Sequence, residues 1–214
     1  MQSSFIVSVI IPVFNSEKYI GRCLRSLKKQ SLDKKNFEII VIDDFSKDNS
    51  IKEVLKYKSK NIKLLKNSKN LGLPRTINKG IKEAKGSLIV RVDSDDWVHE
   101  DFLNILSTFL YINKELDAVA CDYTITGANE KAIKIENCIN KPIGCGIMFR
   151  LQQLLELGLY DHKFKYAEEE ALRSSFLKKY IITRIPLSLY RYRQHRNNRS
   201  KNIRLVKFYN QKIK

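Results

Sequence analysis

Three carboxylates lie close together in the segment Arg91-Val-Asp-Ser-Asp-Asp-Trp97. They are Asp93, Asp95 and Asp96, and they follow a short apolar run. Carboxylates this close repel one another unless a cation or several hydrogen-bond donors compensate, and hard divalent cations prefer carboxylate oxygens as ligands. In an extended segment Asp93 and Asp95 point to the same side, whereas Ser94 points away. The cluster therefore indicates a divalent-metal site.

The same stretch has a second interpretation, an Asp-rich turn that begins a helix. In that case Asp96 would be the N-terminal cap, because a carboxylate at this position accepts a hydrogen bond from a free backbone N–H of the first turn. The spacing of the carboxylates leaves both interpretations open.

The composition predicts one domain in a reducing compartment. The 214 residues, 43% of them hydrophobic, suffice for one sizeable core. The cysteines, none of them in a Cys-x-x-Cys pair, are Cys23, Cys121, Cys138 and Cys145. This pattern argues against a disulfide framework or a zinc knuckle and favours a cytoplasmic protein. The apolar run 5–14 has no basic region before it and is too short for a membrane span, so we expect no signal peptide and no integral segment.

The formal charge of +17 predicts anionic partners. Nucleic acid, an anionic membrane surface and phosphorylated substrates all fit such a charge. Much of the excess is lysine spread along predicted helices, which also suits a solvated surface. Since the sequence contains no recognition-helix or RNA-binding signature, binding to nucleic acid by charge alone is the weakest of these hypotheses, and we expect no nucleic-acid partner.

Strands and helices alternate in the first half of the chain. The strands are expected at Val7–Val13, Phe37–Asp43, Ile62–Leu65 and Ser87–Val92, and the helices between them at about 17–30, 50–57 and 74–84. This alternation is typical of an α/β fold with a parallel sheet and right-handed crossovers.

Ligands of such sheets bind at the carboxyl ends of the strands. The loops expected along that edge are 12–15, 43–44, 67–72 and 93–96. Two of these loops are acidic, so we expect the carboxylates of both to face one crevice.

The second half of the chain is less regular. Helices are expected at 102–111, 151–157, 168–178 and in the last dozen residues; strands at 117–126, 144–150 and 180–185; and a hairpin or loop at 127–141. We expect a ligand-binding half at 1–98, a second half of the same domain at 99–190, and a basic tail at 191–214.

Seven segments in this order resemble the family-2 glycosyltransferases. They are Val7–Asn15, Ile40–Ser50, Asn70–Gly80, Arg91–Trp97, Gly146–Arg150, Ala167–Arg173 and Tyr192–Ser200. The resemblance covers nearly the whole chain. It implies a GT-A fold, which is a Rossmann-like, mostly parallel sheet flanked by helices with a small acceptor-side region. It also implies inverting transfer of a hexosyl or N-acetylhexosaminyl group from a nucleotide-sugar, most simply a UDP-sugar, to a glycan or lipid-linked acceptor in bacterial surface polysaccharide or lipooligosaccharide synthesis.

The resemblance assigns a metal and a nucleotide site. The family's Asp-x-Asp element matches Asp93 and Asp95, so Asp95 is the principal expected ligand of Mn²⁺ or Mg²⁺, with Asp93 and His195 as further ligands. Such a cation neutralises the leaving diphosphate. The residues expected at the nucleotide-sugar are Pro12, Val13, Phe14, Glu17, Asp43, Asp44, Asn70, Gly72, Asn78, Asp93, Ser94 and Arg193. For the pair Asp43–Asp44, a helix-capping turn is the alternative.

A late helix carries the expected catalytic base. The attacking hydroxyl must lose its proton to a carboxylate, which in the family is the Asp of a Glu-Asp pair. The matching residues here are Glu168 and Glu169, so the resemblance implies Glu169 as the base and Glu168 as the substitute candidate. Three consecutive glutamates also fit a simple acidic helix start, which the helix dipole stabilises.

The chain departs from the family at two positions. Glu169 is longer than the family's Asp, which moves the carboxylate by about 1 Å, a displacement that can be costly in catalysis. Ala171 stands where the family often has a further Asp. Both departures motivate an alternative function, a catalytically decayed protein that binds nucleotide or glycan without turnover.

The tail, residues 191–214, interleaves basic and aromatic residues. Such a segment could dock on an anionic bilayer, which suits acceptors carried on lipid. We therefore expect a cytoplasmic protein, peripheral at the inner face of the plasma membrane.

Overall fold

The computed structural model describes residues 6–195, 198 and 203–213. Within them lie the strands β1 (Val7–Val13), β2 (Phe37–Asp43), β3 (Ile62–Lys66), β4 (Leu88–Arg91), β5 (Trp97–Val98), β6 (Ala118–Thr126), β7 (Ala132–Glu136), β8 (Ile147–Arg150) and β9 (Ile182–Arg193). The helices are α1 (Ile20–Lys28), α2 (Ser50–Leu55), α3 (Leu73–Lys82), α4 (Phe102–Ile112), α5 (Leu151–Glu156), α6 (Glu168–Leu177) and α7 (Ile203–Asn210).

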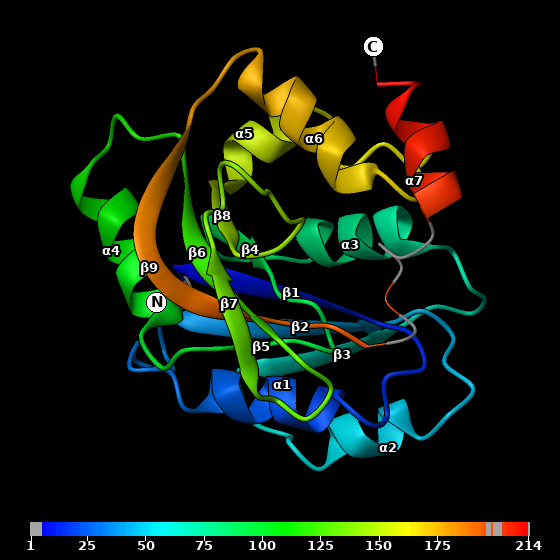
Figure 1. The fold of residues 1–214 in the computed structure, drawn as a ribbon. Helices are drawn as coiled ribbons and strands as arrows, with labels where there is room; N and C mark the ends of the chain where they lie inside the picture. The colour runs from blue at the N-terminus through cyan, green and yellow to red at the C-terminus, as the bar shows by residue number, and fades with distance from the viewer. Residues whose placement is uncertain (1–5, 196–197, 199–202, 214) are drawn as a thin grey trace.

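One sheet joins both halves of the chain. Its strand order is β3-β2-β1-β4-β8-β6-β9-β5, and β7 pairs with β6 at the side. The pairs β1–β2, β2–β3 and β1–β4 are parallel, as predicted, whereas β8 runs antiparallel to β4 and to β6. The long strand β9 curls along β6 and carries the chain back toward β5 (Figure 1).

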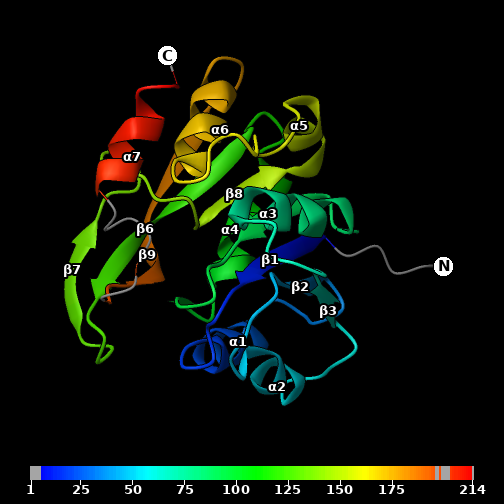
Figure 2. The same cartoon turned by 90° about the vertical axis from the view of Figure 1, so that its right-hand side faces the viewer.

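Helices cover both faces of the parallel part of the sheet. Figures 1 and 2 show α1 and α2 on one side of β1–β3 and α3 on the other, while α7 stands beside α6. Because β1 and β2 are covered on both faces, all seven residues of each are buried, and their sequences are nearly continuous apolar runs. No helix of the described ranges combines the length and apolarity that a bilayer crossing requires.

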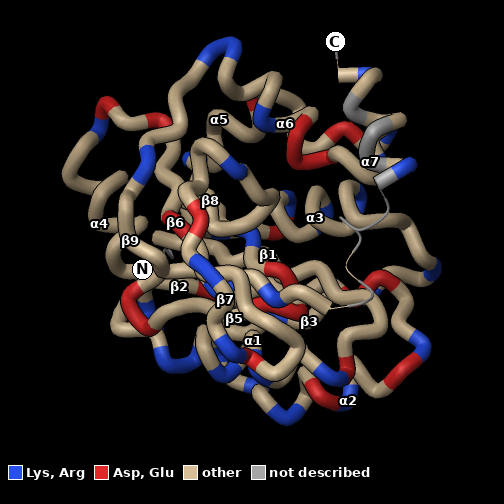
Figure 3. Tube along the Cα trace, viewed as in Figure 1, with Lys and Arg blue, Asp and Glu red and all other residues tan. Residues whose placement is uncertain are grey.

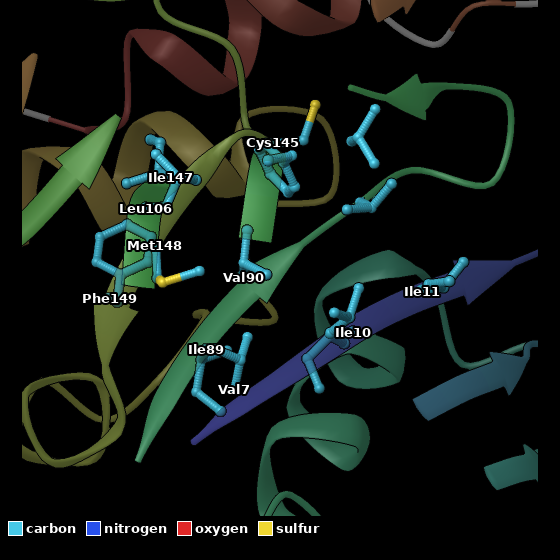
Figure 4. Close-up of a cluster of buried hydrophobic side chains, with 14 of the residues drawn as sticks. Val7, Ile10, Ile11, Ile89, Val90, Leu106, Cys145, Ile147, Met148 and Phe149 are labelled. Carbon is cyan, nitrogen blue, oxygen red and sulfur yellow. The ribbon is translucent and has the colours of Figure 1, made fainter. Parts of the chain in front are cut away.

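The core is continuous from β1 across β4 to β8. Figure 4 shows side chains of β1, among them Val7, Ile10 and Ile11, next to Ile89 and Val90 of β4 and to Met148 and Phe149 of β8. Burying one such aliphatic side chain contributes about 1.5–3 kcal/mol. This apolar layer holds the ends of β1, β2 and β4 in a fixed relationship.

Helix α3 packs directly on the sheet at Gly80. A Cβ atom there would lie 2.6 Å from Ile42 Cδ1 and 2.9 Å from Ile10 Cγ2, closer than any real contact. The glycine therefore sets how near α3 approaches β1 and β2, and with it the loop that precedes the helix.

The expected end of the last strand and the helix-cap alternative for Asp96 were wrong. The last strand does not end at Ile185, since β9 continues to Arg193 and so crosses the expected boundary of the tail. The pairing with β6 shifts register where Ile185 faces Cys121 and Ser188 faces Asp122, so Pro186, which lacks an N–H, lies in a bulge. Asp96 does not cap a helix either, because α4 begins at Phe102.

The remaining predicted elements are present. The segment 127–141 contains β7, antiparallel to β6, which confirms the hairpin. The first helix begins at Ile20 rather than Glu17. In the last predicted helix, α7 begins at Ile203, and residues 196–197 and 199–202 before it lie outside the described residues.

Candidate active site

The carboxyl ends of β1, β2 and β4 meet at one edge of the sheet. The backbone N–H of Asp44 donates to Val13 O over 2.8 Å, and the hydroxyl groups of Ser16 and Ser94 lie 2.8 Å apart. Ser94 is buried, so this contact fixes the acidic loop after β4 against the loop after β1. Figure 3 shows acidic segments gathered between β1 and β3 and at the start of α6.

Asp95 and His195 form a pair across this edge. The Nε2 atom of His195 lies 2.8 Å from Asp95 Oδ2, and the Asp95 side chain is 26% exposed. The ring of Tyr19 stacks on the imidazole with 4.8 Å between ring centroids. One carboxylate oxygen and one imidazole nitrogen therefore converge, with the carboxylate partly exposed and the imidazole largely covered.

Asp93 turns toward a different partner. Arg91 donates to both carboxylate oxygens of Asp93, over 2.6 Å from Nε and 3.1 Å from Nη2. Burial raises the pKa of Asp93, Arg91 opposes this rise, and the charges of Asp95 and Glu169 add to it. Asp93 is thus held by a guanidinium, while its near neighbours include both the metal candidate and the base candidate.

Asp96 is buried, and its carboxylate is bonded to other parts of the protein. Its carboxylate accepts hydrogen bonds from the Tyr190 hydroxyl and the Arg193 backbone N–H, each over 2.8 Å. Burial, with the charges of Asp95 and Asp93, raises the pKa of Asp96 well above its usual range. Of the described residues, Asp93, Asp96 and Cys145 hold their ligand atoms within 4.8 Å of one another. Because Asp96 is buried and already bonded, Asp95 and His195 are better placed to meet a cation.

Asp43, the last residue of β2, and Asp44, which follows it, have different surroundings. Asp44 accepts hydrogen bonds from Asn67 Nδ2 over 2.9 Å, from Leu71 N over 2.7 Å and from Gly72 N over 2.9 Å. The Asp43 carboxylate accepts the Ser46 N–H, over 3.2 Å to Oδ2 and 3.4 Å to Oδ1. Asp44 therefore shapes the 67–72 loop, and Asp43 keeps more acceptor capacity. The helix-capping alternative fails for Asp44, which bonds to the loop before α3 rather than to α2.

The other nucleotide candidates divide by exposure. Pro12 and Val13 are buried in β1, whereas Phe14 is 51% exposed at its end. Glu17 Oε2 accepts from Asn49 N over 2.9 Å and from the Asn49 amide over 3.1 Å. Exposed Asn70 donates to the backbone oxygen of Asp44 over 3.3 Å.

Arg193 and Asn78 are engaged within the protein. Arg193 is 3% exposed, and its guanidinium donates to Asp95 O over 2.8 Å and Glu130 Oε1 over 2.9 Å while lying over the Trp97 ring. Asn78 donates to Tyr160 O over 2.7 Å and accepts from Tyr160 N over 3.0 Å. Both side chains tie loops together, so Arg193 orients the backbone of Asp95.

Helix α6 brings its first residues to the same region. Glu168 is 3% exposed, and its Oε1 lies 3.6 Å from Arg91 Nη1. Glu169 is partly buried and lines a small hollow with Gly144 and Tyr160. The two glutamates thus differ: Glu168 faces the buried guanidinium of Arg91, and Glu169 lines the small hollow.

Sequence reasoning missed Arg91, Tyr190 and Tyr19 as parts of the site. Tyr190 is fully buried and also accepts the N–H of Asp93 over 3.1 Å. Arg91 was visible as the residue two before Asp93, since a side chain at this spacing lies on the same side of an extended segment. Nothing local distinguished Tyr190 or Tyr19 from ordinary core and surface aromatics.

Comparisons with known proteins give relatives of this chain. It is 41% identical over 105 residues to poly(ribitol-phosphate) beta-N-acetylglucosaminyltransferase TarS of Staphylococcus aureus strain Mu50, covering 48% of this chain and 18% of TarS. It is 40% identical over 120 residues to the Bacillus subtilis protein EpsH, named a glycosyltransferase, covering 55% of this chain and 33% of EpsH.

The structure of S. aureus TarS 1–349 in complex with UDP-GlcNAc superposes with a TM-score of 0.78 at 25% identity, covering 92% of this chain and 61% of that one. This likeness confirms the predicted GT-A fold. The chain spans less than two thirds of the length of each of these relatives. The sequence profile of glycosyl transferase family 2 matches residues 8–174. The chain therefore belongs to glycosyl transferase family 2.

Proposed function

We propose that this chain is an inverting glycosyltransferase that moves a hexosyl or N-acetylhexosaminyl group from a UDP-sugar to a hydroxyl of a glycan or lipid-linked acceptor. The observation that carries this proposal is that Asp95 pairs with His195, while the charge of Glu169 reaches the neighbouring Asp93. The complex of TarS with UDP-GlcNAc supports the choice of a UDP-sugar as the first donor to test.

Asp95 and His195 have the chemistry to hold a divalent cation. Carboxylate and phosphate oxygens suit Mn²⁺ and Mg²⁺, while the imidazole nitrogen favours the transition metal Mn²⁺. Their ligand atoms already lie 2.8 Å apart without a side chain between them. When bound, such a cation neutralises charge on the diphosphate leaving group. Asp93, whose carboxylate Arg91 occupies, would serve the ribose or sugar hydroxyl groups better than the metal.

Glu169 is the residue that we assign as the base. The acceptor oxygen forms a bond to the anomeric carbon, the bond from that carbon to the diphosphate oxygen breaks, and UDP leaves with the electron pair. The proton of the acceptor hydroxyl passes to the Glu169 carboxylate. Glu168 is less suited to this role, since it is buried and faces the Arg91 guanidinium.

The residues of the first half would hold the nucleotide. Phe14 presents an exposed aromatic face for the base, and Asp43 retains oxygens that can accept from an imide N–H. Asp44 would act indirectly, by shaping the loop that contains Asn70 and Gly72.

The experiment is a donor screen in the presence of Mn²⁺ or Mg²⁺. We expect release of UDP from at least one UDP-sugar, stimulated by a polyol-phosphate or lipid-linked acceptor and abolished by EDTA. Inverted configuration at the anomeric carbon, read by NMR of the product, would establish the stereochemistry. Tight UDP binding without turnover on any donor would refute the enzymatic proposal and favour the decayed binding protein.

The net charge of the chain suggests where the enzyme binds its acceptor. With a net charge of +17, the protein should bind vesicles that contain anionic lipid and release them as salt rises. We propose that this attraction places the enzyme at the inner face of the plasma membrane. Equal co-sedimentation with neutral and anionic vesicles would contradict the proposal.

A further inference from the structure

Arg91 lies between the two chemically distinct parts of the site. It is the last residue of β4, and its side chain is 9% exposed. On one side, its Nε and Nη2 donate to the two oxygens of Asp93 over 2.6 and 3.1 Å. On the other side, its Nη1 lies 3.6 Å from Glu168 Oε1, at the start of α6. One planar guanidinium therefore faces the acidic loop and the helix of the base at the same time.

The contact with Glu168 is an ion pair without a hydrogen bond. Within the described part of the chain, Arg91 Nη1 is buried and has no hydrogen-bond acceptor. A buried donor that lacks an acceptor is unfavourable, and a buried charge is tolerated only near a compensating one. The opposite charge on this side is that of Glu168, so a shift of α6 away from Arg91 would weaken an ion pair inside the protein.

The backbone at Gly144 packs closely against both Arg91 and Glu169. A Cβ atom at Gly144 would lie 2.9 Å from Glu169 Cβ and 3.0 Å from Arg91 Nη1. The backbone at Gly144 thus contacts the guanidinium and the neighbouring glutamate together. Arg91 and Glu169 cannot move toward each other without displacing the backbone at Gly144. The position of Glu169 is therefore coupled to that of Arg91.

We propose that Arg91 is a positioning residue that, through Glu168 and the close approach at Gly144, fixes the carboxylate of Glu169 relative to Asp93. The inference rests on the proposed function, and it explains why two glutamates are placed in succession: Glu168 anchors the helix and Glu169 is left to take the proton. An error of about 1 Å in the placement of a base is enough to lower turnover strongly.

The test separates turnover from donor binding in the full chain. Glu168→Gln keeps the size of the side chain and removes its charge. We expect kcat of transfer to fall by about 10- to 100-fold while KM for the donor stays within about twofold. Arg91→Lys, which keeps the charge but loses the fork that holds Asp93, should lower kcat and also raise KM. Glu156→Gln removes an exposed carboxylate that pairs with Lys179 over 2.9 Å, and serves as the matched control with unchanged kinetics.

A double-variant cycle tests the coupling itself. If Arg91 and Glu168 act as one unit, the kcat of the double variant Arg91→Lys/Glu168→Gln should be no lower than that of the worse single variant. Losses that multiply would overturn the inference, as would an unchanged kcat in Glu168→Gln.

A variant at Gly144 protects the test against a failure to fold. Gly144→Ala removes no charge but pushes against Glu169 and Arg91, and we expect the same selective loss of kcat with donor KM retained. A fall in melting temperature with wild-type kcat and KM at low temperature would show a purely structural role and overturn the inference. Absence of transfer by the wild-type chain would instead overturn the proposed function, and the inference with it.

Discussion

The imidazole Nε2 of His195 lies 2.8 Å from the carboxylate Oδ2 of Asp95, although 100 residues separate them in the chain. The strand β9 makes this contact, because the N–H of Arg193 at its end donates to Asp96 over 2.8 Å. His195, which the sequence assigned to the tail, thereby lies against the acidic loop 93–96. The pair is the most specific feature of the proposed metal site.

Replacing Asp95 should abolish the metal dependence of donor binding. In Asp95→Ala the remaining imidazole cannot hold a hard cation alone, so we expect the affinity for UDP in the presence of Mn²⁺ to fall by about tenfold or more, to the value measured in EDTA. Isothermal titration calorimetry with and without Mn²⁺ measures both. Asp33→Ala, an exposed carboxylate paired with Lys35, is the control. Mn²⁺-stimulated turnover in Asp95→Ala would exclude this site.

Glu169→Gln should separate binding from chemistry. The variant keeps the side-chain shape but cannot accept the proton, so turnover should fall by about 10²-fold or more while UDP affinity stays near that of the wild type. Initial-rate assays give the turnover and calorimetry gives the UDP affinity, both on one preparation. An equal loss of turnover and UDP affinity would mean that Glu169 supports the fold instead.

Asp44→Asn should destabilise the protein more than its position in a loop suggests. Its buried carboxylate accepts three hydrogen bonds from the 67–72 loop, and an amide cannot accept all of them. A buried donor left without an acceptor costs about 1–3 kcal/mol in the free energy of unfolding. Urea unfolding measures the change, with Asp33→Asn, a substitution at an exposed aspartate, as control. Unchanged stability would show that the loop does not depend on Asp44.

The ion pair between Asp122 and Arg184 should make stability depend on acid. Arg184 donates to Asp122 over 2.9 and 2.6 Å and lowers the pKa of this carboxyl in the folded protein. The unfolded chain, with an Asp pKa of about 3.9, then binds more protons near pH 4, so the stabilisation is complete above that pH and is lost as the pH falls further.

The difference in unfolding free energy between wild type and Asp122→Asn should therefore be largest near neutral pH and shrink as the pH falls below about 4. Arg184→Met should show the same dependence, because it removes the other partner of the same pair. Urea unfolding at a series of pH values measures the difference. A difference that does not change with pH would contradict the assignment.

Local pattern was sufficient for the first half of the fold. The apolar runs of β1 and β2 and the helical spacing between them predict parallel strands, and the carboxyl ends of such strands must share an edge. The sequence therefore identified the loops 43–44 and 93–96 as neighbours. It also identified Glu168 and Glu169 as the start of a helix.

The tertiary structure decided how these residues divide their tasks. In the folded protein Asp44 bonds to the 67–72 loop, and Asp93 bonds to Arg91. Asp96 accepts a hydrogen bond from Tyr190, and Asp95 pairs with His195. No periodicity encodes these choices, because each depends on a partner that the fold brings from a distant segment. The bulge at Pro186 is the clearest case: local propensity ends the strand there, whereas pairing with β6 continues it and carries Tyr190, Arg193 and then His195 to the acidic loop.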